Sequence, residues 1–375
     1  MPPSSRPSST VLLQTLRADG TISTGDAPWL AADPPALAVS RDRVEGMLLG
    51  VAIGDALGRP SEASLPKRRR RLYGEVRDYH RHYRAKKSTE PARGEPSDDT
   101  QLTFWALDQM VADGGLDPEA LSERYAREGR YLIGIGATVK AFRTRAAEGL
   151  PWTARGVGSA GNGALMRAPA FLLPHLRAPS PALWSDAALA AFVTHNDSAS
   201  TASCVAFTAM LWDLLGMDAP PAPGWWVETF LARAAPLEVS ADYTPRGGDD
   251  VETFKGTLCD RVRNQIGGLA DDARSIEEIC NAMHSGAYLL ETVPCALLIL
   301  ARCAHDPEEA IVRAVNDTKD NDTVAAIVGA AVGALHGRAA LPARWIEGLS
   351  GRLKKRGEAG VVFDILARGC DAFCP

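Results

Sequence analysis

Glycine recurs at every fourth position within the segment RDRVEGMLLGVAIGDALG, at Gly46, Gly50, Gly54 and Gly58. A spacing of four places these residues on one face of a helix. Glycine weakens a helix interior, so a glycine face is expected where the backbone of a second helix approaches closely. The segment therefore predicts a buried central helix with another helix packed against its glycine face.

Signals for helix starts occur along the rest of the chain. Runs that alternate apolar and polar residues, as expected for β-strands, are scarce. Further helices are expected to begin at Asp117–Pro118, at Ser185, at Ser275 with Glu278 as a capping box, and at Asp306–Pro307. These signals predict an all-α fold with a single domain spanning residues 41–375.

Residues 1–40 are rich in Pro, Ser, Ala and Thr. We expect this segment to be an N-terminal extension outside the main domain, with a possible small hairpin around Asp19–Gly20. A second unusual segment is the basic stretch PKRRRRLYG that begins at Pro66. Such runs are mostly solvated loops, and the alternative is a rim that attracts a phosphate-bearing ligand.

The composition excludes some classes of function. With 41 basic and 46 acidic residues, the net charge of -5 gives no general field for nucleic acid or an anionic membrane. The seven cysteines contain no CxxC pair, which favours reduced core thiols over disulfides or a zinc site. No apolar run is long enough for a signal peptide or a membrane span, so a cytoplasmic protein is expected.

Two clusters of oxygen-bearing side chains stand where helices are expected to begin. They are Ser97, Asp98 and Asp99 in PSDDTQLTFW, and Asp320, Asp322 and Thr323 in KDNDTVAAIVG. One such cluster alone would be read as helix capping. Adjacent carboxylates repel one another unless a cation neutralises them, and Mg²⁺ or Mn²⁺ accepts such hard oxygen ligands. If the clusters meet in space, they could form a two-metal site.

The ordered set of motifs resembles the ADP-ribosylglycohydrolase family, which includes dinitrogenase reductase-activating glycohydrolase and the ADP-ribosyl-acceptor hydrolases. The resemblance covers residues 43–338. Its motifs, in chain order, are GMLLGVAIGDALGRPSE, PSDDTQLT, GSAGNGALMR, THND, GAYLLETVPCAL and VNDTKDNDTVAAIVGAAVGALHG. It implies an orthogonal helical bundle of the family type.

The resemblance also implies the site. Both acidic clusters would bind two divalent cations, Mg²⁺ or Mn²⁺. Glu62 in GDALGRPSE corresponds to a glutamate that faces the substrate ribose, although a lone glutamate after a helix is more often a solvated end. Glu62 and Asp98 are the candidates for proton transfer, with their individual roles open. Asp55 is expected to be structural because a buried carboxylate needs partners.

The segment GSAGNGALMR would form a substrate loop whose free backbone N–H groups hold a diphosphate. The expected ADP-ribose contacts are Gly158, Ser159, Gly161, Asn162 and Gly163. Several relatives carry an aromatic residue in place of Ala160, so stacking would have to come from another ring, such as Trp152 or Tyr288.

Two further candidates are His195 in VTHNDSAS and Glu291 in AYLLETVP. His195 either contacts the substrate in the cleft or is a structural hydrogen-bonding residue. Glu291 either faces the cleft or pairs with a buried base. We favour the cleft for Glu291.

The expected function is a metal-dependent hydrolase that removes ADP-ribose from a modified protein, with ADP-ribosyl-arginine as the default linkage. The first alternative is an immunity protein that docks its extension, residues 1–40, into an ADP-ribosyltransferase toxin. A non-catalytic reader of ADP-ribose is disfavoured because the metal ligands and Glu62 are all present.

Overall fold

The computed structural model describes residues 7–85, 92–268 and 272–375. Its α-helices are α1 (Ser9–Ala18), α2 (Arg41–Gly58), α3 (Pro66–Tyr73), α4 (Asp98–Asp113), α5 (Pro118–Glu128), α6 (Ala137–Ala147), α7 (Trp152–Arg155), α8 (Ala182–Phe192), α9 (Ser198–Gly216), α10 (Pro223–Ala234), α11 (Leu258–Ile266), α12 (Ile276–Ala282), α13 (Leu289–Cys303), α14 (Pro307–Asp317), α15 (Asn321–His336), α16 (Ala343–Gly348) and α17 (Val361–Phe373). The 3₁₀ helices are η1 (Pro28–Ala31), η2 (Arg59–Ser61), η3 (Gly129–Tyr131), η4 (Asn162–His175), η5 (Ala235–Leu237) and η7 (Arg338–Ala340).

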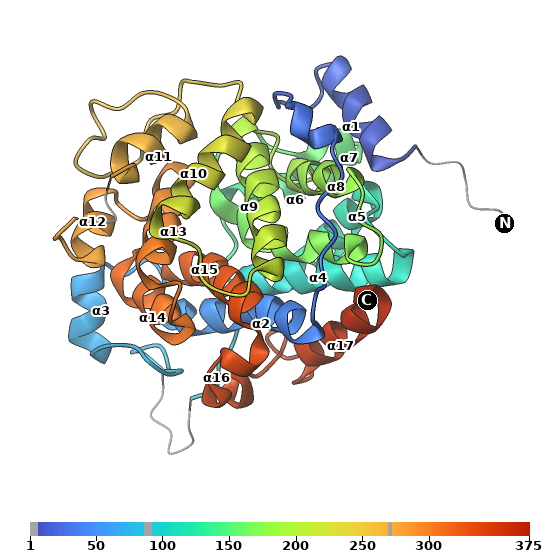
Figure 1. The fold of residues 1–375 in the computed structure, drawn as a ribbon. Helices are drawn as coiled ribbons and strands as arrows, with labels where there is room; N and C mark the ends of the chain where they lie inside the picture. Colours follow the sequence, from blue (N-terminus) through green and yellow to red (C-terminus); the bar gives the residue numbers. More distant parts are fainter. Residues whose placement is uncertain (1–6, 86–91, 269–271) are drawn as a thin grey trace.

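The fold is a bundle of helices in which α2 and α15 lie at the centre (Figure 1). Within the described residues, β structure is limited to isolated bridges, such as Val157 with His195 and Gly161 with Tyr288. The predicted all-α class is therefore confirmed.

The glycine face of α2 packs directly against α15, as its spacing predicted. A Cβ atom added at Gly50 would lie 2.0 Å from the carbonyl oxygen of Gly329, and one added at Gly54 would lie 2.1 Å from that of Ala325. At Gly58 the nearest atom would be the Cα of Asp322, at 2.4 Å. Because α2 positions rise as α15 positions fall, the helices are antiparallel. The end of α2 therefore meets the start of α15, where the second acidic cluster lies.

Most of the predicted helix starts are confirmed. The side chain of Asp117 caps α5, Asp306 caps α14, and Ser275 with Glu278 forms the capping box of α12. The start at Ser185 is wrong, because α8 already begins at Ala182 and contains Ser185 as a buried residue. Apolar packing of the preceding residues extends that helix beyond its polar signal.

The N-terminal extension lies on the domain rather than away from it. Its helix α1 packs against α8 and buries Leu13 and Leu16, so the hairpin expected around Asp19–Gly20 is wrong. Asn196 donates to the carbonyl oxygen of Thr21 at 2.7 Å, which ties the extension to the residue after His195. Leu13 and Leu16 pack on the domain, whereas Val11 is 50% exposed. Docking of this segment into a toxin stays a prediction.

The basic stretch forms helix α3 and not a loop. Arg69, at its centre, is fully buried and donates to the carbonyl oxygens of Asn316 at 3.0 Å and Thr318 at 2.8 Å. It also donates to the Ser61 hydroxyl at 2.9 Å. Since Ser61 precedes Glu62, Arg69 joins the segment that carries Glu62 to the segment that leads into Asp320.

The long apolar helices of the chain lie in the protein core. Among the described residues, α9 alone has the length and hydropathy of a membrane span, and 89% of that stretch is buried inside the protein. All seven cysteines are free and buried, as the sequence predicted.

Candidate active site

Asp55 organises the junction of α2 with α4. It is fully buried on α2 and accepts hydrogen bonds from the Ser97 hydroxyl at 2.7 Å and the Thr100 hydroxyl at 2.5 Å. It also accepts from the backbone N–H groups of Ser97 at 2.8 Å and Thr100 at 3.1 Å. Asp55 therefore supplies from another helix the oxygen that a capping side chain would normally provide.

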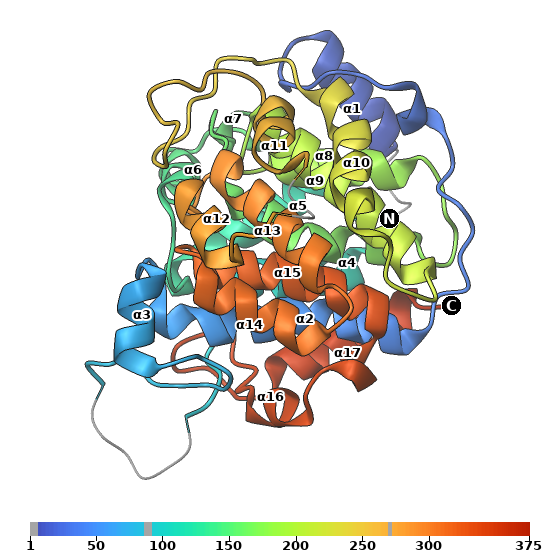
Figure 2. The same cartoon turned by 60° about the vertical axis from the view of Figure 1, so that its left-hand side comes forward.

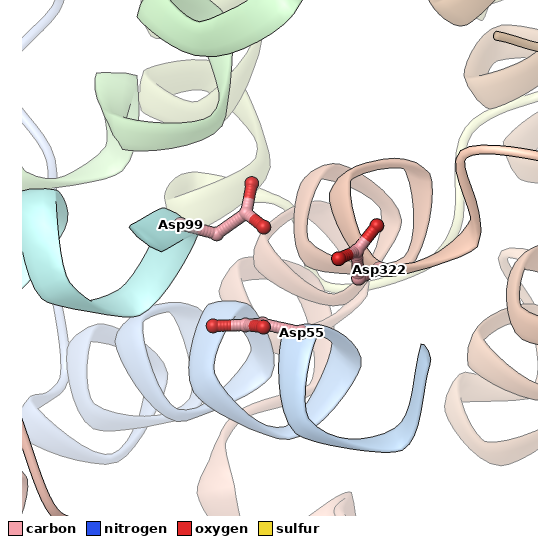
Figure 3. A group of neighbouring side chains, drawn as sticks. All are labelled: Asp55, Asp99 and Asp322. Atoms are coloured by element: carbon pink, nitrogen blue, oxygen red, sulfur yellow. The ribbon is translucent and has the colours of Figure 1, made fainter. Parts of the chain in front are cut away.

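The two acidic clusters meet at this junction. Carboxylate oxygens of Asp55, Asp99 and Asp322 lie within 4.8 Å of one another, and so do those of Glu62, Asp320 and Asp322. Figure 3 shows the first group, with Asp55 on α2, Asp99 at the start of α4 and Asp322 at the start of α15. Asp322 belongs to both groups, so two adjacent oxygen-rich positions share one carboxylate.

Helix capping does not account for these clusters. Ser97 and Asp320 occupy the N-cap positions of α4 and α15, but neither side chain makes a capping hydrogen bond. Ser97 instead donates to Asp55, and Asp320 accepts from the side-chain amide of Asn162 at 2.6 Å. These side chains therefore form hydrogen bonds with residues of other segments and do not cap their own helices.

Burial and mutual repulsion favour the protonated form of these acids. Glu62 is exposed at the cavity, where desolvation, together with the charges of Asp320 and Asp55, raises its pKa to about 7. Burial, together with the charges of Asp55 and Glu62, raises the pKa of Asp98 to about 8. Burial raises the pKa of Asp320 to about 6, despite the hydrogen bond from Asn162. A bound cation would reverse this balance because it stabilises the ionised carboxylates.

The donor set fits divalent cations. One oxygen of Asp99, Oδ1, is buried without a hydrogen-bond partner, which is costly for a carboxylate unless another group satisfies it. Every side chain in both groups offers carboxylate oxygen, the donor that Mg²⁺ and Mn²⁺ accept. The buried carboxylates that would hold the ions are Asp55, Asp99, Asp320 and Asp322. Glu62, the exposed member of the second group, lines the cavity beside them.

A cavity of about 170 Å³ opens above these acids. The predicted site residues that line it are Glu62, Asp98, Gly161, Asn162, Gly163, His195, Asp320, Asp322 and Thr323. Of the other predicted residues, Ser97 and Asp99 lie buried beneath it, whereas Gly158, Ser159 and Glu291 lie outside its described lining. The structure thus brings the proton-transfer candidates and most of the predicted ligands to one pocket.

The glycine-rich segment forms one wall of the cavity. The Ser159 hydroxyl accepts from the backbone N–H of Gly161 at 3.2 Å and lies 2.9 Å from the Thr138 hydroxyl. Asn162 donates to Asp320 and also, at 2.9 Å, to the Thr292 hydroxyl. Ser159 therefore fixes the conformation of the loop without lining the cavity. Asn162 connects the loop to the second acidic cluster.

His195 lies beneath this wall as a neutral ring. It is buried, and burial lowers its pKa to about 3. Its Nδ1 lies 2.8 Å from the Thr194 hydroxyl, which itself accepts from Arg167 at 2.5 Å. Nε2, the other ring nitrogen, lies near Gly161 and Gly163. In the tautomer in which Thr194 donates to Nδ1, the proton is on Nε2. In that tautomer, His195 can donate a hydrogen bond at the cavity wall.

Glu291 contacts the cavity residue Arg246 but does not itself belong to the described lining. Its carboxylate accepts from the backbone N–H of Arg246 at 2.7 Å, and burial raises its pKa. The Arg246 guanidinium lies 4.2 Å from the centre of the Tyr288 ring, and Arg246 itself lines the cavity. Glu291 therefore holds the arginine segment in place, and Tyr288 lies beside the glycine wall, bridged to Gly161. Trp152 contacts Phe192 and is not part of the described lining.

Comparisons with known proteins agree with the motifs. A family model described as ADP-ribosylglycohydrolase matches residues 36–370. The chain belongs to the ADP-ribosylglycohydrolase family.

The alignments with similar proteins extend over most of this chain. An uncharacterized protein of Archaeoglobus fulgidus is 30% identical over 83% of this chain and 92% of its own length. The ADP-ribosylarginine hydrolase Tri1 of Pseudomonas putida is 27% identical over 88% of this chain and 81% of its own. A solved structure titled as an ADP-ribosylglycohydrolase-related protein complex matches with a TM-score of 0.60 and 26% identity, over 88% of this chain and 97% of its own.

The structure adds site residues of this ADP-ribosylglycohydrolase that the sequence interpretation missed. They are Gly134, Gly136 and Thr138 before and within α6, and Arg246 after α10. A Cβ atom at Gly134, whose φ is +83°, would lie 2.9 Å from the Oδ1 atom of Asp98. The GIG pattern at residues 134–136 was the sequence signal that could have indicated this part of the cavity wall. Nothing in the local sequence indicated Arg246, which reaches the cavity through the long segment between α10 and α11.

Proposed function

We propose that this chain is a divalent-cation-dependent hydrolase that removes ADP-ribose from modified protein side chains. The observation that carries the proposal is the convergence of two carboxylate groups, sharing Asp322, at the floor of a cavity lined by the glycine-rich segment. ADP-ribosyl-arginine is the default substrate, supported by the similarity to a relative named ADP-ribosylarginine hydrolase. The seven free, buried cysteines support a cytoplasmic location.

The bond to be cleaved joins the anomeric carbon of ribose to a side-chain atom of the acceptor. Such cleavage passes through an oxocarbenium-like state, and it needs a proton for the leaving group and an activated water. Mg²⁺ or Mn²⁺, when bound, would fix ribose hydroxyls and make a bound water more acidic. Asp55, Asp99, Asp320 and Asp322 would hold these ions.

The remaining residues bind the substrate or transfer protons. Glu62 and Asp98 face the same cavity, where either carboxyl can transfer a proton to or from the substrate. Their pKa values, raised to about 7 and about 8 in the metal-free protein, would fall when a cation binds. The neutral His195, in the tautomer protonated at Nε2, can donate to an oxygen of the substrate. Backbone N–H groups of the glycine-rich wall and the Arg246 guanidinium suit the diphosphate.

The test replaces Asp322 with asparagine and measures release of ADP-ribose from arginine-, serine- and nucleic-acid-linked substrates with each metal. Asp322→Asn should lower turnover by at least about 100-fold, because the shared carboxylate is lost from both groups. The thermal midpoint of the metal-free protein should not fall, since one repulsive charge is removed. Asp218→Asn, an exposed site, is the matched control. Undiminished turnover in Asp322→Asn would overturn the proposal.

A further inference from the structure

Arg167 is a buried cation without a carboxylate partner among the described residues. It lies in η4, after the glycine-rich segment, and is fully buried. Its Nη2 atom donates to the carbonyl oxygen of Ala190 at 3.0 Å and to the Thr194 hydroxyl at 2.5 Å, and its guanidinium lies 5.0 Å from the centre of the Tyr125 ring. Its Nε and Nη1 atoms have no hydrogen-bond partner within the described part of the chain. Because a buried guanidinium with unpaired donors is costly, we expect this arginine to serve the residues that it contacts.

Thr194 is the side chain that accepts from this arginine. It lies in the turn between α8 and α9, which lie side by side in Figures 1 and 2, and it directly precedes His195. Val157 holds the backbone of this turn, because its N–H donates to the carbonyl oxygen of Thr194 at 3.0 Å and its own carbonyl oxygen accepts from Asn196 at 2.9 Å. With the backbone fixed, side-chain hydrogen bonds determine what the His195 ring presents to the cavity.

The proton of the Thr194 hydroxyl has one acceptor within reach among the described residues. The hydroxyl oxygen already accepts from Arg167, and the Nδ1 atom of His195 lies 2.8 Å away. If the hydroxyl donates to Nδ1, the neutral ring carries its proton on Nε2 and both sides of the contact are satisfied. If Nδ1 carries the proton instead, the hydroxyl accepts two hydrogen bonds and its own proton has no acceptor. Because an unsatisfied buried donor is costly, the first arrangement is favoured.

The ring of His195 carries a single proton. Burial and, to a smaller extent, the charge of Arg167 lower its pKa to about 3. Nε2 is the nitrogen on the cavity side, since a Cβ atom added at Gly161 or at Gly163 would lie 3.5 Å from it and His195 lines the cavity. The tautomer therefore decides whether the cavity wall offers a hydrogen-bond donor or an acceptor at this point.

We propose that Thr194, oriented by Arg167, is a positioning residue that holds His195 in the tautomer protonated at Nε2. The consequence for catalysis rests on the proposed hydrolase function: His195 offers a donor to a substrate oxygen and cannot serve as a base from Nε2. Proton transfer is then left to Glu62 and Asp98. A donor that is fixed before the substrate arrives needs no reorganisation during the reaction.

The first experiment determines the tautomer directly and needs no substrate. The full-length protein is labelled with nitrogen-15 at histidine and studied by NMR at neutral pH with Mg²⁺ present, because the nitrogen shifts distinguish a protonated ring nitrogen from a bare one. The signals that disappear in His195→Asn belong to His195. In the wild type, Nε2 should show the shift of a protonated nitrogen and Nδ1 that of a bare nitrogen.

Variants of Thr194 test whether its hydroxyl sets this preference. Thr194→Val keeps the side-chain volume and removes the hydroxyl, so the fraction of His195 protonated at Nδ1 should rise by at least about 10-fold. Thr194→Ser restores the hydroxyl and should restore the wild-type shifts. Thr208→Val on α9 is the matched control and should leave the shifts unchanged, because the Thr208 hydroxyl is buried without a hydrogen-bond partner among the described residues.

The second experiment measures the consequence for the reaction. Thr194→Val should lower kcat/KM for free ADP-ribosyl-arginine by about 10-fold, because the hydrogen bond from His195 to the substrate is weakened. Thr194→Ser should recover most of this loss, and Thr208→Val should match the wild type.

A wild-type spectrum with the proton on Nδ1 would overturn the proposal, and this outcome does not depend on how any variant folds. Unchanged His195 shifts in Thr194→Val would also overturn it. If the wild type fails to hydrolyse ADP-ribosyl-arginine, the hydrolase proposal fails instead, and the NMR measurement still decides which nitrogen of His195 carries the proton.

Discussion

Replacing Gly50 with alanine tests whether the glycine face of α2 sets the geometry of the metal site. The added Cβ atom would lie 2.0 Å from the carbonyl oxygen of Gly329 and 2.4 Å from its carbonyl carbon. Ordinary contact begins at 3.4 Å, so α2 and α15 must move apart locally by about 1.4 Å. Both clashing atoms belong to the backbone, so no side chain can rotate to relieve the contact.

The expected cost follows from two opposing terms. Overpacking of a well-packed core costs up to about 3 kcal/mol. Alanine is better than glycine in a helix interior by about 1 kcal/mol, which offsets part of that cost. Gly50→Ala should therefore lower the free energy of unfolding by about 2 kcal/mol, measured by urea denaturation. Gly268→Ala is the control, because no atom of the described residues lies within 4 Å of a Cβ atom at that position.

The same substitution should weaken metal binding. Asp55 lies on α2 and Asp322 on α15, so separation of the two helices changes the distance between their carboxylates. We expect about a 10-fold loss of Mn²⁺ affinity, measured by calorimetry, because metal sites tolerate only small changes in ligand position. Unchanged stability and unchanged Mn²⁺ affinity in Gly50→Ala, relative to Gly268→Ala, would refute this reasoning.

Two further predictions concern the charges at the site. In the unfolded chain carboxyls ionise near pH 4, whereas the folded pKa values are raised to about 6 for Asp320, about 7 for Glu62 and about 8 for Asp98. The folded state therefore holds more protons across that interval, and the metal-free protein should lose stability as pH rises from about 4 through about 8. Thermal melts should show this fall, and Mn²⁺ should abolish it; a flat metal-free profile would contradict it. Arg69→Met should cost about 3 kcal/mol in urea denaturation, because it leaves buried carbonyl oxygens without their donor. The exposed Arg68→Met should change stability by less than about 0.5 kcal/mol, and equal effects of the two would argue against the buried role.

Local signals predicted much of the fold. The glycine spacing in residues 41–58 predicted a helix with a closely packed partner, and α15 is that partner. The capping signals at Asp117, Ser275 and Asp306 predicted helix starts because capping is a local hydrogen bond between neighbours in sequence. The start at Ser185 failed because tertiary burial lengthened α8 beyond its local signal.

The sequence also predicted the chemistry of the site, because the residue type alone determines that carboxylates supply hard oxygen ligands. It could not predict how each acid is used. Asp98 faces the cavity and Asp99 is buried beneath it, although they are adjacent in the chain. Their positions depend on the neighbours that α2 and α15 provide.

The sequence by itself determined the helical class, the central glycine helix and the supply of oxygen ligands, because these depend on residue type and on spacing within one segment. Only the tertiary structure decided that Arg69 is buried and bonded to the segment that leads into Asp320, and that Arg246 reaches the cavity. These features depend on contacts between segments far apart in the chain, and no local pattern encodes such contacts.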